Sequence, residues 1–236
     1  MVFRALLVLI AAVAFAGSPF LVPDFGGYDP SQFPVPQTNP PVQPAGYAFG
    51  IWGVIYLWLV AMAGFGLAAR RQHPDWDRSR WPLIASLGVG SIWLSVAVVS
   101  PLWATVLIWT MLGTAIAALL RTPATDRWWL QEAVGLYAGW LTAASAVSIG
   151  LAASGWGIPP FAPEGWAIAA LSLGLVIAVA VLTWRPVLSY GAAIVWALIA
   201  VAVRNGTDTV GIFALVAAAI IVAVTLGRFS KDRRAA

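Results

Sequence analysis

The chain consists of long apolar segments that follow one another, separated by short charged or proline-containing breaks. Eight segments can be marked, at residues 3–22, 47–69, 82–100, 102–120, 128–151, 166–184, 186–203 and 210–227. A helix that spans a membrane needs about 20 mostly apolar residues, and lipid offers its backbone polar groups no partner outside the helix. The pattern therefore predicts an all-α integral membrane protein, a bundle of about eight transmembrane helices in a lipid bilayer.

The composition removes several classes of function. Apolar residues make up 61% of the chain and charged residues 9%, which leaves too little polar surface for a soluble globule. There is no cysteine for a thiolate site, and the single histidine, His73, cannot form a multi-histidine metal centre. We therefore expect no metal site and no obligatory cofactor. The basic residues lie at segment ends, which indicates topology signals and no nucleic-acid partner.

The distribution of basic residues also predicts the orientation. If the N-terminus is cytoplasmic and all eight segments span the membrane, only Arg204 of the 13 Lys and Arg residues lies outside. This positive-inside bias holds only for an even number of spans. We therefore expect the N- and C-termini in the cytoplasm and a location in the bacterial inner membrane. Alternatively, residues 1–16 are a cleaved signal peptide, which leaves seven helices and an external N-terminus.

The first loop, residues 23–46, is rich in proline and carries Asp24 and Asp29 with no basic residue. Loops of this length within a compact bundle are often functional. The loop is therefore either a lid over a cavity or a passive connector.

Similar sequence patterns occur in the two halves of the chain. Residues 40–48 and 159–167 both read PPxxPxG-aromatic-Ala, and Pro82 and Pro186 open the third and seventh segments. These similarities indicate either two duplicated four-helix halves, as in some transporters, or only the general preference for proline at helix starts.

Glu132 is the one ionisable residue inside a predicted span, and we expect it to be interfacial and paired with Arg121 or Arg127. Charges near the middle of a bilayer are costly and are kept for proton relays and ion sites. A carrier coupled to protons or sodium is therefore disfavoured. The serines in the spans have no base among the helices to activate them, so we expect no enzyme.

Aromatic residues supply the candidate site. A rise of 1.5 Å per residue places rings from the second, third and fifth segments in the outer half of the membrane, below the first loop. We predict that these residues bind a planar apolar ligand by stacking: Tyr47, Phe49, Trp52, Tyr56, Trp93, Tyr137 and Trp140. The alternative is ordinary aromatic packing between helices.

These residues resemble the pattern of the TspO/MBR family (translocator protein, tryptophan-rich sensory protein). The run Tyr47-Ala48-Phe49-Gly50, Trp52-Gly53 and Tyr56 is similar to the start of the family's second helix, with one residue missing before Trp52. In the third segment Trp93 is kept, but Gly90 and Ser95 replace the family's asparagine and proline. The fifth keeps Tyr137 and Trp140, with Ser148 in place of another asparagine.

The resemblance covers residues 1–151 and implies a five-helix region whose pocket, under the first external loop, binds porphyrins, sterols or synthetic aromatic ligands. Residues 152–236 would then be three additional transmembrane helices and a short basic cytoplasmic tail. A non-covalently bound porphyrin would stack without iron coordination, because His73 lies in a loop on the cytoplasmic side. The two missing asparagines would have been polar anchors for a ligand, so the family's ligands cannot be assigned to this chain from the resemblance.

Three functions follow from these observations. The first is a non-enzymatic membrane receptor or sensor for a planar hydrophobic ligand, tetrapyrrole-like or sterol-like. The alternative is a facilitative transporter or exporter of a lipophilic metabolite, and a third is breakdown of a bound porphyrin through tryptophan chemistry. Gly64–Gly66 and Gly88–Gly90 permit close helix approach, so a homodimer is also compatible with the sequence.

Overall fold

The computed structural model describes residues 1–22 and 26–235, with side chains up to residue 230, and the described chain is all-helical apart from loops and turns. Its α-helices are α1 (Val2–Gly17), α2 (Ile51–Ala69), α3 (Pro74–Ala97), α4 (Pro101–Leu119), α5 (Gln131–Gly155), α6 (Pro163–Trp184), α7 (Leu188–Asn205) and α8 (Thr209–Ala235). By length and composition, seven of these helices, all but α3, can cross a membrane. The prediction of an all-α membrane bundle is confirmed.

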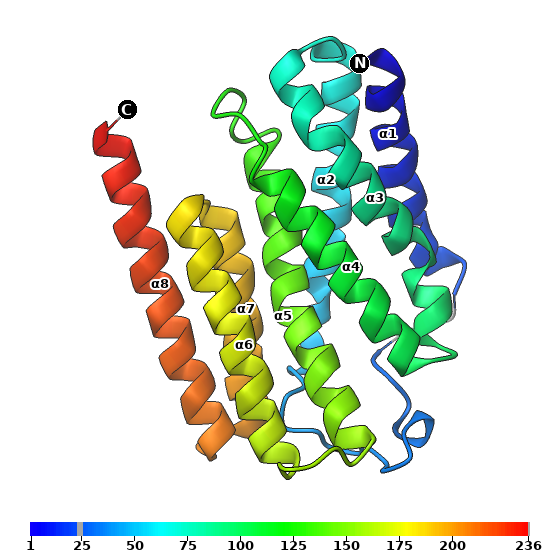
Figure 1. Ribbon diagram of the computed structural model, residues 1–236, viewed down its shortest axis with the longest axis vertical. Helices are drawn as coiled ribbons and strands as arrows, with labels where there is room; N and C mark the ends of the chain where they lie inside the picture. Colours follow the sequence, from blue (N-terminus) through cyan, green and yellow to red (C-terminus); the bar gives the residue numbers. More distant parts are fainter. Residues whose placement is uncertain (23–25, 236) are drawn as a thin grey trace.

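Consecutive helices run in opposite directions, so both chain ends lie at the same end of the bundle (Figure 1). We call this the basic end, because the α2–α3, α4–α5 and α6–α7 connections with their arginines also lie there. The opposite end carries residues 26–50, which we call the strap, together with Arg204 at the end of α7. The arrangement separates the basic residues as the sequence predicts. Which end faces the cytoplasm stays a prediction.

Helix α3 starts earlier than the sequence suggested, because it begins at Pro74 and Pro82 lies in its interior. The expectation that Pro82 opens this segment was wrong. Proline at the first helical position and acidic residues in the first turn both favour a helix start, and here they are Pro74, Asp75 and Asp77. Pro186, in contrast, precedes α7. The two prolines therefore do not correspond, which removes part of the support for an internal duplication.

Helix α5 is the central helix of the bundle and lies between α1–α4 and α6–α8 (Figure 1). Most of its residues are buried, including every residue from Gln131 to Thr142. Gly135 and Gly139 bring it close to α7, since a Cβ atom on Gly139 would lie 2.3 Å from the carbonyl oxygen of Tyr190. Small residues four positions apart are a common device for close packing of membrane helices. The two glycines thus fix where α7 lies against α5.

A buried ion pair joins α5 to the α6–α7 turn at the basic end. The Glu132 carboxylate accepts a hydrogen bond from Arg127 Nε at 2.8 Å and another from the backbone N–H of Ser189 at 2.9 Å. Arg127 also donates to the carbonyl oxygen of Pro186. Glu132 lies in the first turn of α5 and is wholly buried inside the protein, because α7 covers it. Its interfacial depth in the membrane stays a prediction. Of the two predicted partners, Arg127 pairs with Glu132, and Arg121 donates to the backbone carbonyl oxygen of Ala117.

Candidate functional site

The strap lies across one end of the bundle and is hydrogen-bonded to three helices. Gln32 Nε2 donates to the carbonyl oxygen of Val98 after α3, and the backbone N–H of Val35 donates to Gly155 at the end of α5, both at 2.9 Å. On the other side, the Trp196 indole N–H of α7 donates to the carbonyl oxygen of Ala48 at 3.0 Å. The strap is therefore a docked segment of the fold. Of the two predicted loop carboxylates, Asp24 lies outside the described residues.

The sequence of the strap explains how it holds this shape. Asp29 caps the short helical turn Pro30–Gln32 by accepting a hydrogen bond from the backbone N–H of Ser31. Phe33 is buried against Gly155, where a Cβ atom would lie 2.2 Å from its ring. The Asn205 side chain donates to the carbonyl oxygen of Pro41 at 2.8 Å. Prolines stiffen the stretches between these anchors.

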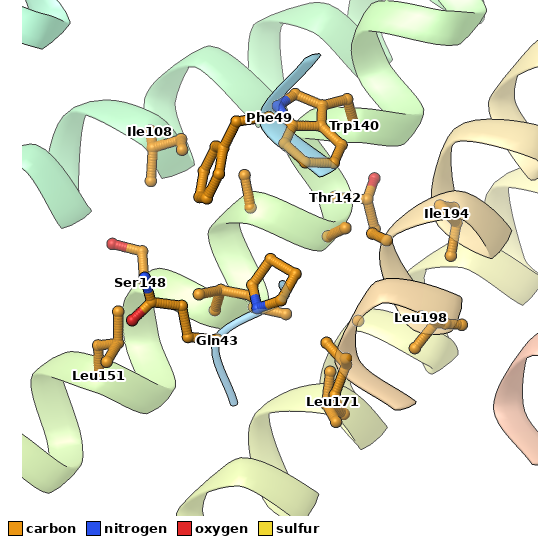
Figure 2. Close-up of a pocket in the computed structure, with 18 of the residues that line it drawn as sticks. Gln43, Phe49, Ile108, Trp140, Thr142, Ser148, Leu151, Leu171, Ile194 and Leu198 are labelled. Carbon is orange, nitrogen blue, oxygen red and sulfur yellow. The ribbon is translucent and has the colours of Figure 1, made fainter. Parts of the chain in front are cut away.

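A cavity of about 80 Å³ lies beneath the strap, around the C-terminal half of α5 (Figure 2). Its residues come from the strap, from α3 and α4, and from the three helices α5, α6 and α7. They are Gly27, Tyr28, Gln43, Pro44, Phe49, Trp93, Ile108, Trp140, Thr142, Ala143, Ala144, Ala146, Val147, Ser148, Leu151, Leu171, Gly174, Leu175, Ile194, Ala197, Leu198 and Val201.

The lining is almost entirely apolar, and no charged side chain occurs among the described residues that form it. Of its polar groups, the Thr142 hydroxyl contacts the Tyr190 hydroxyl at 2.9 Å and the Ser148 hydroxyl contacts Thr105 Oγ1 at 2.6 Å. Tyr28, in the strap, is partly buried. Burial raises the pKa of its phenol to about 12, while a hydrogen bond with Ser148 acts in the opposite direction. The cavity therefore offers neutral hydrogen-bonding groups in an apolar enclosure.

Three of the seven predicted ligand-binding residues line this cavity: Phe49, Trp93 and Trp140. The Phe49 and Trp140 rings meet edge to face, with centroids 6.1 Å apart, and Figure 2 shows them side by side at one edge of the cavity. Trp140 is 2% exposed, and its indole N–H makes no hydrogen bond to any described residue. Trp93 donates to the carbonyl oxygen of Ala104 at 2.9 Å, which fixes α3 against α4.

The other predicted rings pack elsewhere. Trp52, Tyr56 and Tyr137 surround Phe15 of α1, with ring centroids 5.1–5.7 Å from it. Tyr137 is wholly buried and its hydroxyl contacts Ser86 Oγ at 2.9 Å. Trp52 meets one of the cavity rings, Trp140, edge to face. These three side chains are thus a packed aromatic core next to the cavity wall.

Tyr47, the remaining predicted residue, is about half exposed and packs edge to face on Trp196 of α7. It therefore lies on the outer side of the strap.

Sequence reasoning missed the wall contributed by α6 and α7, because the candidate site was confined to the first five segments. Small residues were the available signal: Ala143, Ala144 and Ala146 on α5 and Gly174 on α6 leave room that larger side chains would fill. Gln43, the strap residue whose amide faces Ser148 (Figure 2), was also missed.

A protein-family model described as TSPO-like protein matches residues 30–227 of the chain. The match includes most of the strap and continues past residue 151 through α6 and α7 into α8. The proposed division into a family-like region at residues 1–151 and additional helices at 152–236 stays a prediction. No curated protein and no solved structure matches the chain.

Proposed function

This chain belongs to the TSPO-like protein family, and from that premise we propose that it is a non-enzymatic membrane receptor or sensor. Its ligand is a compact, planar, apolar molecule held in the cavity beneath the strap. The observation that carries the proposal is the cavity itself: an apolar space under a docked strap, edged by Phe49, Trp93 and Trp140. Aromatic rings at the wall of an apolar cavity favour flat partners, which stack on them or meet their edges.

The volume of the cavity limits the size of the ligand. Pockets for drug-sized ligands measure about 300–1,000 Å³, whereas this cavity measures about 80 Å³. A cavity of about 150 Å³ holds a single benzene ring, so a ligand of two fused rings already requires the side chains around this cavity to move apart. A tetrapyrrole or a sterol, the ligand classes implied by the resemblance, would require the strap or helices α6 and α7 to move outward. We therefore propose a compact ligand first.

Fluorescence quenching by a bound aromatic probe tests this function. Protein in lipid nanodiscs would be titrated with a nitrated naphthalene, which absorbs tryptophan emission, and empty nanodiscs would correct for partition into lipid. We expect saturable quenching that a Trp140→Leu substitution reduces. Trp103→Leu is the matched control, because Trp103 on α4 is 63% exposed and lies outside the cavity. Quenching that never saturates, or that falls equally in both variants, would contradict the proposal.

Transport of a lipophilic metabolite is the alternative function, and it requires a path from the cavity to the basic end. In this structure the space between the cavity and the basic end is filled by wholly buried side chains of α5 and α7: Tyr137, Tyr190 and Glu132. This closed side supports a receptor in preference to a transporter. Flux of a cavity-sized probe into liposomes, lost in a variant with a filled cavity, would support transport instead.

We also propose that the basic end faces the cytoplasm and the strap faces outward, since arginines concentrate at the basic end. The native chain has no cysteine, so single cysteines report sidedness cleanly. In intact cells, a membrane-impermeant maleimide should label Thr38→Cys in the strap and not Gln72→Cys in the α2–α3 turn. The reverse labelling would overturn this orientation.

A further inference from the structure

We infer that the basic end carries a binding site for the head group of an anionic phospholipid. The site lies where the α4–α5 connection, the α6–α7 turn and the last turns of α8 meet, which we call the arginine corner. Its basic residues are Arg121, Arg127, Arg185 and Arg228. The corner is at the opposite end of the bundle from the strap, so the inference is independent of the proposed ligand site.

The end of α8 reaches this corner because α8 is long. It has 27 residues against 18 in α7, and the two helices are joined by a short turn after Asn205. The other end of α8 therefore extends past the α6–α7 turn (Figure 1). Figure 1 also shows the α4–α5 connection projecting beyond this turn. Two projecting elements thus flank a turn that is set back along the bundle axis.

One arginine holds the three elements of the corner together. Arg127 Nε donates to the Glu132 carboxylate, and another N–H of its guanidinium donates to the carbonyl oxygen of Pro186 at 3.1 Å. Its Cζ also lies 4.6 Å from the centre of the Phe229 ring on α8, within the range of a cation–π contact. The turn of α8 that carries Arg228 is thereby fixed beside the α6–α7 turn.

Positive charge is in excess at the corner. The nearby carboxylates already have basic partners, because Asp126 pairs with the arginine that follows α2 and Glu132 is wholly buried in its pair with Arg127. Arg121 and Arg228 are exposed, and neither forms an ion pair with a residue whose side chain the structure describes. Both charges are therefore available to an anion from outside the protein.

Exposed tryptophans mark the level of the lipid head groups at the corner. Trp184 at the end of α6 is 78% exposed, and Trp128 in the α4–α5 connection is 66% exposed. Tryptophan side chains are enriched where a membrane meets water, at the level of the head groups. Arg185 follows Trp184 and donates to the carbonyl oxygen of Thr122. This arginine therefore lies at the depth of lipid phosphates.

The helices next to the corner offer a surface for acyl chains. Helices α6 and α8 pack against each other, and exposed apolar side chains continue along both, Leu173 and Val176 on α6 and Val222 and Leu226 on α8. A phospholipid fits a basic corner that adjoins an apolar face, whereas a soluble anion would use the arginines alone. The corner therefore favours a lipid over a free phosphate.

Phosphate chemistry matches arginine in particular. The planar guanidinium group donates two parallel hydrogen bonds to a phosphate group. Clusters of basic residues directly after a membrane helix are typical of contacts with anionic lipids, and here the sequence from residue 228 to 234 reads RFSKDRR. A zwitterionic lipid carries its own positive charge next to the phosphate. The corner therefore selects lipids whose head group has a net negative charge.

Native mass spectrometry tests the inference, because it counts the lipids bound to each protein molecule and gives the affinity of each. The protein in neutral detergent would be titrated with dioleoylphosphatidylglycerol, which is anionic, and with dioleoylphosphatidylcholine, which has the same acyl chains and no net charge. A basic residue at a membrane surface contributes about fivefold to the affinity for an anionic lipid. With two exposed arginines, we expect phosphatidylglycerol to bind about 25-fold more tightly than phosphatidylcholine.

The double variant Arg121→Gln/Arg228→Gln removes the two exposed charges and should abolish most of this preference. The matched control Arg71→Gln/Arg78→Gln removes two exposed arginines from the α2–α3 side of the same end and should leave the preference unchanged. The variant Arg121→Lys/Arg228→Lys keeps both charges and should retain most of the preference. Glycerol 3-phosphate, which has the phosphate and no acyl chains, should bind far more weakly than phosphatidylglycerol.

Four outcomes would overturn the inference. The first is equal affinity for phosphatidylglycerol and phosphatidylcholine in the wild type. The second is an equal loss in the glutamine variant and in its α2–α3 control, which would mean that the whole basic end attracts anions without a site at the corner. The third is an equal loss in the lysine and glutamine variants, and the fourth is glycerol 3-phosphate binding as tightly as the lipid.

Discussion

Filling the cavity from α5 should stabilise the protein and abolish ligand binding at the same time. Ala144 lines the cavity, and the substitution Ala144→Leu places three more carbon atoms in it. Cavities in protein interiors cost about 24 cal/mol per Å³. For about 80 Å³, complete filling therefore contributes at most about 2 kcal/mol. The corresponding rise in Tm is up to about 8 °C, at about 2–4 °C per kcal/mol for a chain of this size.

Thermal unfolding of the purified protein, followed by tryptophan fluorescence in detergent micelles, measures this effect. Binding of the nitrated naphthalene to the same samples in nanodiscs should fall below detection in Ala144→Leu. The matched control is Ala138→Leu, on the same helix but at a position that is fully buried and outside the cavity. There the larger side chain has no space and should destabilise the protein by about 1–3 kcal/mol.

The two variants together make the reasoning refutable. If Ala144→Leu lowers Tm as much as Ala138→Leu does, the space beneath the strap is not available to a side chain. If Ala144→Leu binds the probe with wild-type affinity, the probe binds elsewhere, and the assignment of the site fails.

Other parts of the fold give further predictions. Gly139→Ala should destabilise the protein by about 1–3 kcal/mol, because the new methyl group would meet the backbone of α7. Gly64→Ala is its control: the methyl group there meets open space, so the variant should be neutral or slightly stabilising in the same thermal assay. Glu132→Gln should cost about 1–3 kcal/mol, because it weakens charged hydrogen bonds in a buried network; an unchanged Tm would show that this network is dispensable. Hydrogen bonding from Arg70 holds the pKa of Asp126 below its usual value, so this contact stabilises the α4–α5 connection at neutral pH and is lost as pH falls below about 4. An Asp126→Asn variant should therefore unfold with a smaller dependence on acid pH than wild type.

The sequence was sufficient for the helices because each span carries its own signal: an apolar run of the required length between charged or proline-containing breaks. The partner of Glu132 was predictable to within two residues, Arg121 and Arg127, and the structure pairs it with Arg127. The start of α3 was missed because the first turns of this helix are polar. Pro74 and the acidic residues after it are the signal for where the helix begins.

The candidate site was only partly predictable, because orientation of a ring depends on neighbours that are distant in sequence. Phe15 of α1 lies against Gly90 of α3 and draws Trp52 and Tyr56 into a packed cluster, away from the cavity. Similarly, the glycines of α5 determine how closely α7 approaches. Neither effect leaves a periodic pattern in the sequence, so the contribution of α6 and α7 to the cavity emerged only from the packed structure.

A bound heavy atom would test the central claim most directly. A crystal of the protein grown with a brominated naphthalene should show an anomalous bromine peak in the cavity beneath the strap, between Trp140 on α5 and Leu198 on α7. A bromine peak found only on lipid-facing surfaces, such as the side of α4 that exposes Trp103, would contradict a ligand site at this place.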